Sequence, residues 1–177
     1  MKTLLIACLI SQAAFLYAAE EGTSTDAAWS DSLNIGGAFV TWKYESSGET
    51  YAPISFEAIL DYKAFEPLEV SLRIGMGFGE DENEVGSSTQ SAEVDLYKML
   101  YLKPYVGWES MRLYALLGYG DYDIEASPNV GASGVSYGVG SDYNLFDVAT
   151  VFLEWRRLPK TSSDKLSSIA MGFVLPY

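Results

Sequence analysis

The sequence predicts an all-β fold, namely an eight-stranded antiparallel up-and-down transmembrane β-barrel. Apolar and polar residues alternate with a period of two over segments of about ten residues, and the connections between these segments are alternately short and long. After the N-terminal leader, no segment has the roughly 20 consecutive apolar residues of a membrane helix. If the chain lies in a membrane, only a closed barrel satisfies its backbone hydrogen bonds there.

The first segment predicts a secretory signal peptide. Lys2 supplies a positive charge, residues 4–10 form an apolar run, and Ala18 is the small residue before the expected cleavage point. The sole cysteine of the chain, Cys8, lies in this segment and would be removed with it. We expect three regions: a cleaved signal peptide at 1–18, a flexible polar lead-in at 19–32, and one barrel domain at 33–177.

Composition excludes several functions. The net charge of -13 argues against nucleic acid as a partner, because phosphate binding needs clustered cations. The chain has no histidine, and the mature chain would have no thiol, which excludes imidazole or thiolate metal sites and histidine-dependent nucleophilic catalysis. We therefore expect no enzymatic activity and no cofactor.

Residues 68–78 show the alternation most clearly. Leucine, valine, isoleucine, methionine and phenylalanine fall on one face of the expected strand, while Glu69, Ser71, Arg73 and two glycines fall on the other. Similar runs predict eight strands, at residues 33–44, 53–64, 68–79, 93–107, 111–123, 134–143, 148–157 and 166–177.

The connections between these strands predict the polarity of the barrel. Four are long and polar (45–52, 80–92, 124–133 and 158–165), and the three between them are short (65–67, 108–110 and 144–147). Outer-membrane barrels have short periplasmic turns and long external loops. An even number of strands then places both termini on the periplasmic side.

Aromatic residues are expected to form a girdle at the two membrane interfaces, where rings with one polar edge are favoured. The expected short-turn group is Phe65, Trp108, Phe146 and Tyr177, and the expected long-loop group is Trp42, Tyr44, Tyr51 and Trp155.

The polar face carries both signs of charge, which favours a narrow, crowded lumen over a solvated surface. The alternative is a soluble lipocalin-like periplasmic carrier, which would hide the apolar face instead. We predict that one lumen charge cluster contains Glu57, Asp61, Arg73, Glu154 and Arg156. Paired charges that fill the lumen explain this cluster, and a narrow pore for small solutes is the alternative.

The C-terminal half resembles a known family. The segments "RLYALLGYGDYDI" (112–124), "SGVSYGVGSDY" (133–143), "FLEWRR" (152–157) and "SIAMGFVLPY" (168–177) resemble the last four strands of small outer-membrane barrels of the OmpX/Ail and opacity-protein type. The resemblance implies a bacterial outer-membrane location, lipid as the surroundings, a monomer, and a structural or adhesive role with an unknown external ligand. Small outer-membrane barrels of the lipid A deacylase and protease types rely on a catalytic histidine, which is absent here.

The resemblance also implies an insertion signal that the barrel-assembly machinery reads during biogenesis. Pro176 departs from the family pattern because it cannot donate to the strand ladder. The implied signal is Ile169, Met171, Phe173, Leu175 and Tyr177.

Overall fold

A computed structural model describes residues 32–46, 49–79, 81–85, 88–125, 130–145, 148–159 and 165–176. The predicted signal peptide, and all of the predicted lead-in except its last residue, lie outside these ranges. They stay predictions. In the described ranges, no helix is long and apolar enough to cross a membrane.

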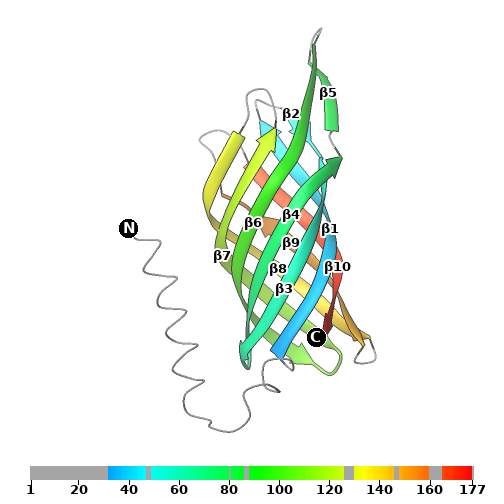
Figure 1. The fold of residues 1–177 in the computed structure, drawn as a ribbon, viewed down its shortest axis with the longest axis vertical. Coiled ribbons are helices and arrows are strands. Elements are labelled where there is room, and N and C mark those ends of the chain that lie inside the picture. Colours follow the sequence, from blue (N-terminus) through cyan, green and yellow to red (C-terminus); the bar gives the residue numbers. More distant parts are fainter. Residues whose placement is uncertain are drawn as a thin grey trace.

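Ten strands form one continuous sheet (Figure 1). They are β1 (Leu33–Ser46), β2 (Glu49–Tyr51), β3 (Ile54–Phe65), β4 (Leu68–Gly79), β5 (Asp81–Val85), β6 (Ser88–Trp108), β7 (Met111–Glu125), β8 (Val130–Leu145), β9 (Ala149–Arg157) and β10 (Lys165–Pro176).

Eight of these strands close into a barrel. Neighbours pair antiparallel in the order β10-β9-β8-β7-β6-β4-β3-β1, and β1 also pairs with β10, from Asn34 opposite Pro176 to Glu45 opposite Lys165. A closed barrel leaves no unpaired sheet edge. The predicted eight-stranded antiparallel fold is therefore confirmed.

The connections have the predicted polarity. Those between β3 and β4, β6 and β7, and β8 and β9 are short and lie at the end where β10 finishes, which we call the short-turn end (Figure 1). The opposite end, which we call the loop end, carries the four longer connections. β6 extends past the other strands there (Figure 1).

The structure adds two short strands that the sequence analysis assigned to loops. β2 pairs with the end of β1, and β5 pairs with the start of β6, from Asp81 opposite Ala92 to Val85 opposite Ser88. β6 consequently starts at Ser88 rather than at residue 93. The reason is that a long polar connection can continue the ladder as a hairpin beyond the barrel, where alternation of apolar residues is not required.

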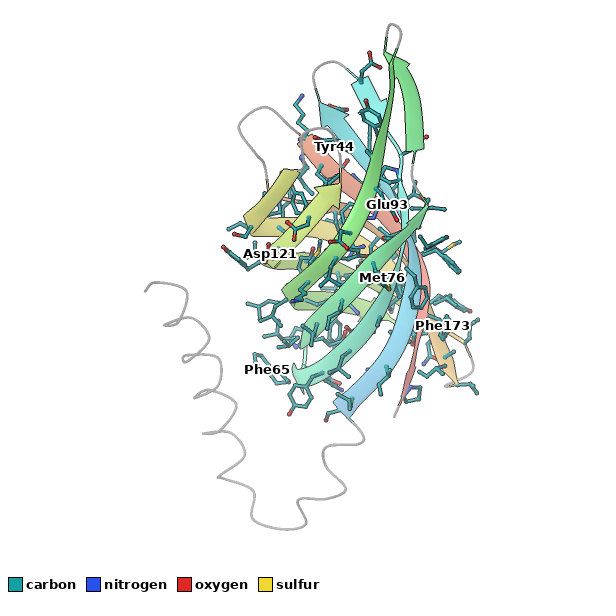
Figure 2. All side chains as sticks on the ribbon, turned by 45° about the horizontal axis from the view of Figure 1, so that its top comes forward. Tyr44, Phe65, Met76, Glu93, Asp121 and Phe173 are labelled. Carbon is teal, nitrogen blue, oxygen red and sulfur yellow. The ribbon has the colours of Figure 1, made fainter. Side chains whose placement is uncertain are left out.

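The two faces of the wall differ in chemistry. Phe39 is 64% exposed, Met76 is 62% exposed and Phe173 is 49% exposed, all on the outer face. Figure 2 shows Met76 and Phe173 pointing away from the barrel. Charged residues such as Glu57 and Arg73 are fully buried inside. A soluble carrier does not fit this arrangement, because the apolar face is the outer one.

Candidate functional site

Arg73 in β4 is the centre of the charged interior. Its Nη1 donates hydrogen bonds to Glu57 Oε1 and to Glu154 Oε2, both at 3.1 Å, and its Nη2 donates to Glu154 Oε1 at 2.8 Å. Its Nε donates to Ser71 Oγ at 2.7 Å. Four of the five guanidinium hydrogens therefore point at acceptors supplied by three different strands, β3, β4 and β9.

Arg156 in β9 contacts the same two carboxylates. Its Nη1 donates to Glu57 Oε2 at 2.7 Å, and its Nε lies 3.9 Å from Glu154 Oε2. Tyr114 in β7 also donates its hydroxyl hydrogen to Glu154, at 2.8 Å. The structure thus places four of the five residues predicted for the lumen cluster in one group around two arginines.

Asp61, the fifth predicted residue, belongs to a second group nearer the short-turn end. It accepts a hydrogen bond from Ser71, which links it to Arg73. Lys103 Nζ lies 3.1 Å from Asp61 Oδ2 and 3.0 Å from Glu69 Oε2. The two groups therefore form one continuous network through the interior.

Arg112 completes the second group. Its Nε and Nη2 donate to the two oxygens of Asp142 at 2.9 and 2.8 Å, and its Nη1 donates to Glu69 at 2.5 Å. Such a bidentate arginine–carboxylate pair has strong and directional hydrogen bonds. Arg112 is the partly exposed member of the network, with 27% of its side chain accessible.

The sequence analysis did not assign Lys103, Arg112 and Asp142 to this network, and it placed Glu69 on the polar face without including it in the cluster. The signal for Lys103 is weak, because its strand carries Met99 and Tyr101 on the same inward face. A strand that is apolar on both faces shows no alternation of polarity.

Charge pairing in this interior is close to complete. Burying a charge is costly unless it is paired and hydrogen-bonded. Each cation lies within 4 Å of two or three carboxylates. The network contains four cations (Arg73, Lys103, Arg112 and Arg156) and five carboxylates (Glu57, Asp61, Glu69, Asp142 and Glu154).

An aromatic layer lies on the loop side of the network. Trp42 Nε1 donates to Ser55 Oγ at 2.8 Å, and this hydroxyl lies 3.2 Å from Tyr97 Oη. The Trp42 and Tyr97 rings meet edge to face, with their centroids 4.9 Å apart. The Tyr44 and Tyr51 rings pack against each other with their centroids 6.0 Å apart. An eight-stranded barrel is just wide enough for side chains to fill, and these rings and charges fill it.

The girdle prediction is wrong for Trp42, Tyr44 and Tyr51, which are 1%, 3% and 5% exposed. For Trp42 and Tyr44 the reason lies in the parity of β1, which turns Phe39 outward and the even-numbered residues inward. Tyr51 lies in β2 opposite Tyr44 and therefore shares its inward face. A tryptophan is compatible with the interior when its N–H finds an acceptor, as it does at Ser55.

The other described girdle residues lie on the outer face. Phe65 and Trp108 are 54% and 59% exposed near the short-turn end. Trp155 is 42% exposed and packs against Tyr137 with a ring separation of 6.4 Å. Phe146 lies outside the described residues.

The predicted insertion signal lies along the outer face of β10. Its four described members are 54%, 64%, 49% and 42% exposed: Ile169, Met171, Phe173 and Leu175. Pro176 ends the strand opposite Asn34, where the missing N–H interrupts no later pair. Tyr177 lies outside the described residues, and recognition by the assembly machinery stays a prediction.

Gly140 gives Tyr114 the space it needs to reach Glu154. A Cβ atom at residue 140 would lie 2.5 Å from Cζ of Tyr114. We expect Gly140→Ala to lower the free energy of unfolding by about 1–3 kcal/mol, the usual cost of overpacking. Urea-induced unfolding in lipid vesicles measures the change.

Gly107→Ala is the matched control for this substitution. The nearest atom to a Cβ there is Cγ of Arg112 at 3.3 Å, in a flexible side chain that can shift. Equal losses in the two variants would contradict a specific packing role for Gly140.

Comparisons with known proteins agree with this architecture. Residues 3–175 match the model of the family described as outer membrane protein beta-barrel domain. A comparison with curated protein sequences found no match.

Three solved structures illustrate the fold. Ail, the attachment invasion locus protein of Yersinia pestis, is 16% identical with a TM-score of 0.57, covering 81% of this chain and 96% of its own. Neisserial surface protein A, NspA, is 10% identical with a TM-score of 0.62, covering 82% and 97%. OprG from Pseudomonas aeruginosa is 14% identical with a TM-score of 0.58, covering 83% and 96%.

The apolar outer face, the enclosed charges and the family match together place this protein in the bacterial outer membrane. The chain belongs to the outer membrane protein beta-barrel domain family.

Proposed function

We propose that this protein is a non-catalytic barrel that keeps its interior closed and acts through its loop end, in adhesion or in envelope integrity. The observation that carries the proposal is the network of nine charged side chains inside the barrel, with aromatic rings packed on its loop side. Charges that pair across the lumen fill it with side chains, which supports a closed interior. The surface available for a partner is then the loop end.

The loop end has its own internal support. The backbone N–H of Ala52, just after β2, donates to Asp81 Oδ2 in β5 at 2.7 Å. This contact joins the β1–β3 connection to the β5–β6 hairpin, which projects beyond the barrel (Figure 1). A supported projection favours binding to a surface, because less chain must be ordered when the partner arrives.

The charge of the loop end favours a neutral or basic partner. The β5–β6 hairpin contributes Asp81, Glu82 and Glu84 to this end. Glu93 and Asp121 also lie toward it (Figure 2), and the chain as a whole carries a net charge of -13. Ail is named for attachment and was solved with a heparin analogue, sucrose octasulfate. An acidic surface repels such a polyanion, so we propose a different ligand class for this chain.

Two measurements test the proposal. The purified barrel in planar bilayers should show no conductance of porin size, and porin-size conductance would contradict the closed interior. Cells that display the full chain should bind cationic beads more strongly than heparin beads. Replacing residues 81–91 by a short Gly-Ser turn should abolish this preference, whereas Lys98→Gln, a wall substitution, should retain it.

A further inference from the structure

The outer wall carries a row of cations at its loop end. Lys43 in β1 lies opposite Ser167 in β10, and Ser167 lies opposite Arg157 in β9. One step closer to the loops, Lys165 lies opposite Glu45. Adjacent strands are about 4.8 Å apart, so three basic residues fall within two strand spacings on the same stretch of wall.

This stretch keeps a surplus of positive charge. Lys43 Nζ lies 2.6 Å from a carboxylate oxygen of Glu45, Lys165 Nζ lies 3.8 Å from the other oxygen, and Arg157 acts electrostatically on the same group. Among the described residues of this stretch, one carboxylate therefore faces three cations. The chain has a net charge of -13 and encloses four of its cations, so a surplus on the outer wall is a local feature.

An apolar groove of about 690 Å³ begins directly below this row. Trp155 and Ile169 line its upper part, and Trp155 precedes Arg157 by two residues in β9. The groove crosses the outer wall to Val106 and Leu113, near the short turn between β6 and β7. Its volume is within the range of about 300–1,000 Å³ that is typical of small-molecule sites.

Small side chains account for the groove. Ala115 and Ser141 lie among its lining, next to the bulky, outward-facing Leu113, Val139 and Leu153. Val139 and Leu153 are 58% and 53% exposed, so they form raised sides. A hollow of this kind in a lipid-facing wall fits an apolar group such as an acyl chain.

We propose that the cation row and the groove together bind one anionic, phosphate-bearing lipid of the outer leaflet. The phosphate lies among Lys43, Arg157 and Lys165, and one acyl chain fills the groove beneath Trp155. Lys and Arg recognise phosphate oxygens through charge-assisted hydrogen bonds, and basic residues next to a membrane attract anionic headgroups. This inference rests on the outer-membrane location and does not depend on the proposed role of the loops.

Quenching of tryptophan fluorescence by bromine tests the proposal, because Trp155 adjoins the groove. The mature chain is refolded into phosphatidylcholine vesicles that contain a minor fraction of brominated phosphatidic acid, or of brominated phosphatidylcholine at equal bromine content. We expect stronger quenching by phosphatidic acid. The test is made in a Trp29→Phe background, in which three tryptophans remain. Trp155→Phe should then remove the difference, since Trp42 is enclosed and Trp108 lies at the other end of the barrel.

Neutralising the row in the triple variant Lys43→Gln, Arg157→Gln, Lys165→Gln should lower the preference for phosphatidic acid at least tenfold, because each basic residue contributes about fivefold. Each single substitution should lower it about fivefold, which keeps the test available if the triple variant fails to insert. The matched control is Lys98→Gln. Lys98 is an outward cation of β6 that lies opposite Asp121, and its loss should leave the preference unchanged.

Three results would overturn the proposal. They are equal quenching by the two lipids in the wild-type chain, a preference that survives neutralisation of the row, and complete competition by excess inorganic phosphate, which would indicate a site for the free ion. A separate variant, Ser141→Phe, fills the groove and should reduce quenching by phosphatidic acid. Unchanged quenching in this variant would exclude the groove as the acyl-chain site.

Discussion

Replacing Arg73 by alanine is expected to lower the free energy of unfolding by about 3–5 kcal/mol, the usual cost of removing one partner from a buried ion pair. The loss follows from what stays behind. Glu57 and Glu154 are both fully buried, and each would lose a hydrogen-bonded cation. Arg156 would then have to pair with both carboxylates. Urea-induced unfolding in vesicles and loss of heat-modifiable gel mobility measure the effect.

Arg157→Ala is the control for this substitution, because Arg157 follows Arg156 in β9 but lies on the outer wall at the loop end. Its removal should change stability far less. If Arg73→Ala lowers the free energy of unfolding by less than about 1 kcal/mol, the ion pairs of Arg73 are no stronger than exposed ones. That result would contradict the buried network. Conductance of porin size in the variant would show that the network blocks an otherwise open channel.

Replacing Trp42 by alanine is expected to cost about 3–5 kcal/mol, as for other large buried aromatic residues. The substitution empties space beside the Tyr97 ring and removes the donor to Ser55. The Ser55 hydroxyl would keep its contact with Tyr97 Oη but lose the indole donor, which adds to the loss of packing. Unfolding in urea, followed by far-ultraviolet circular dichroism, measures the change.

Trp108→Ala is the matched control, since Trp108 is 59% exposed on the outer face near the short-turn end. Trp108→Ala should lower the free energy of unfolding much less than Trp42→Ala. The Trp108 ring contacts lipid and a few neighbouring side chains, whereas the Trp42 ring is packed in the interior. Equal costs for the two tryptophans would support the girdle position that the sequence suggested for Trp42 and contradict its enclosed position.

The strand pattern and much of the charge network could be predicted because the side-chain period of a strand is two. Glu57 and Asp61 share a face in β3, and Arg73 shares a face with Ser71 in β4, whatever the rest of the chain does. The alternation of short and long connections then determined which end of the barrel carries the loops. These features are local, so the sequence alone is sufficient for them.

The second charged group was harder to predict because its members meet only across the closed barrel. Arg112 reaches Glu69, 43 residues earlier in the chain, and Asp142, 30 residues later. Lys103 lies in a strand whose two faces are both rich in apolar and aromatic residues, so no alternation marks it as inward-facing. Such contacts depend on the pairing register of several strands.

By itself, the sequence determined that this chain forms eight antiparallel strands with one apolar face, because strand period and turn length are set by neighbouring residues. Only the tertiary structure decided what each inward or outward position touches. It enclosed Trp42, joined Asp61 to Arg73 through Ser71, and aligned cations from three strands above one groove. The physical reason is barrel closure, which brings together residues that no local pattern relates.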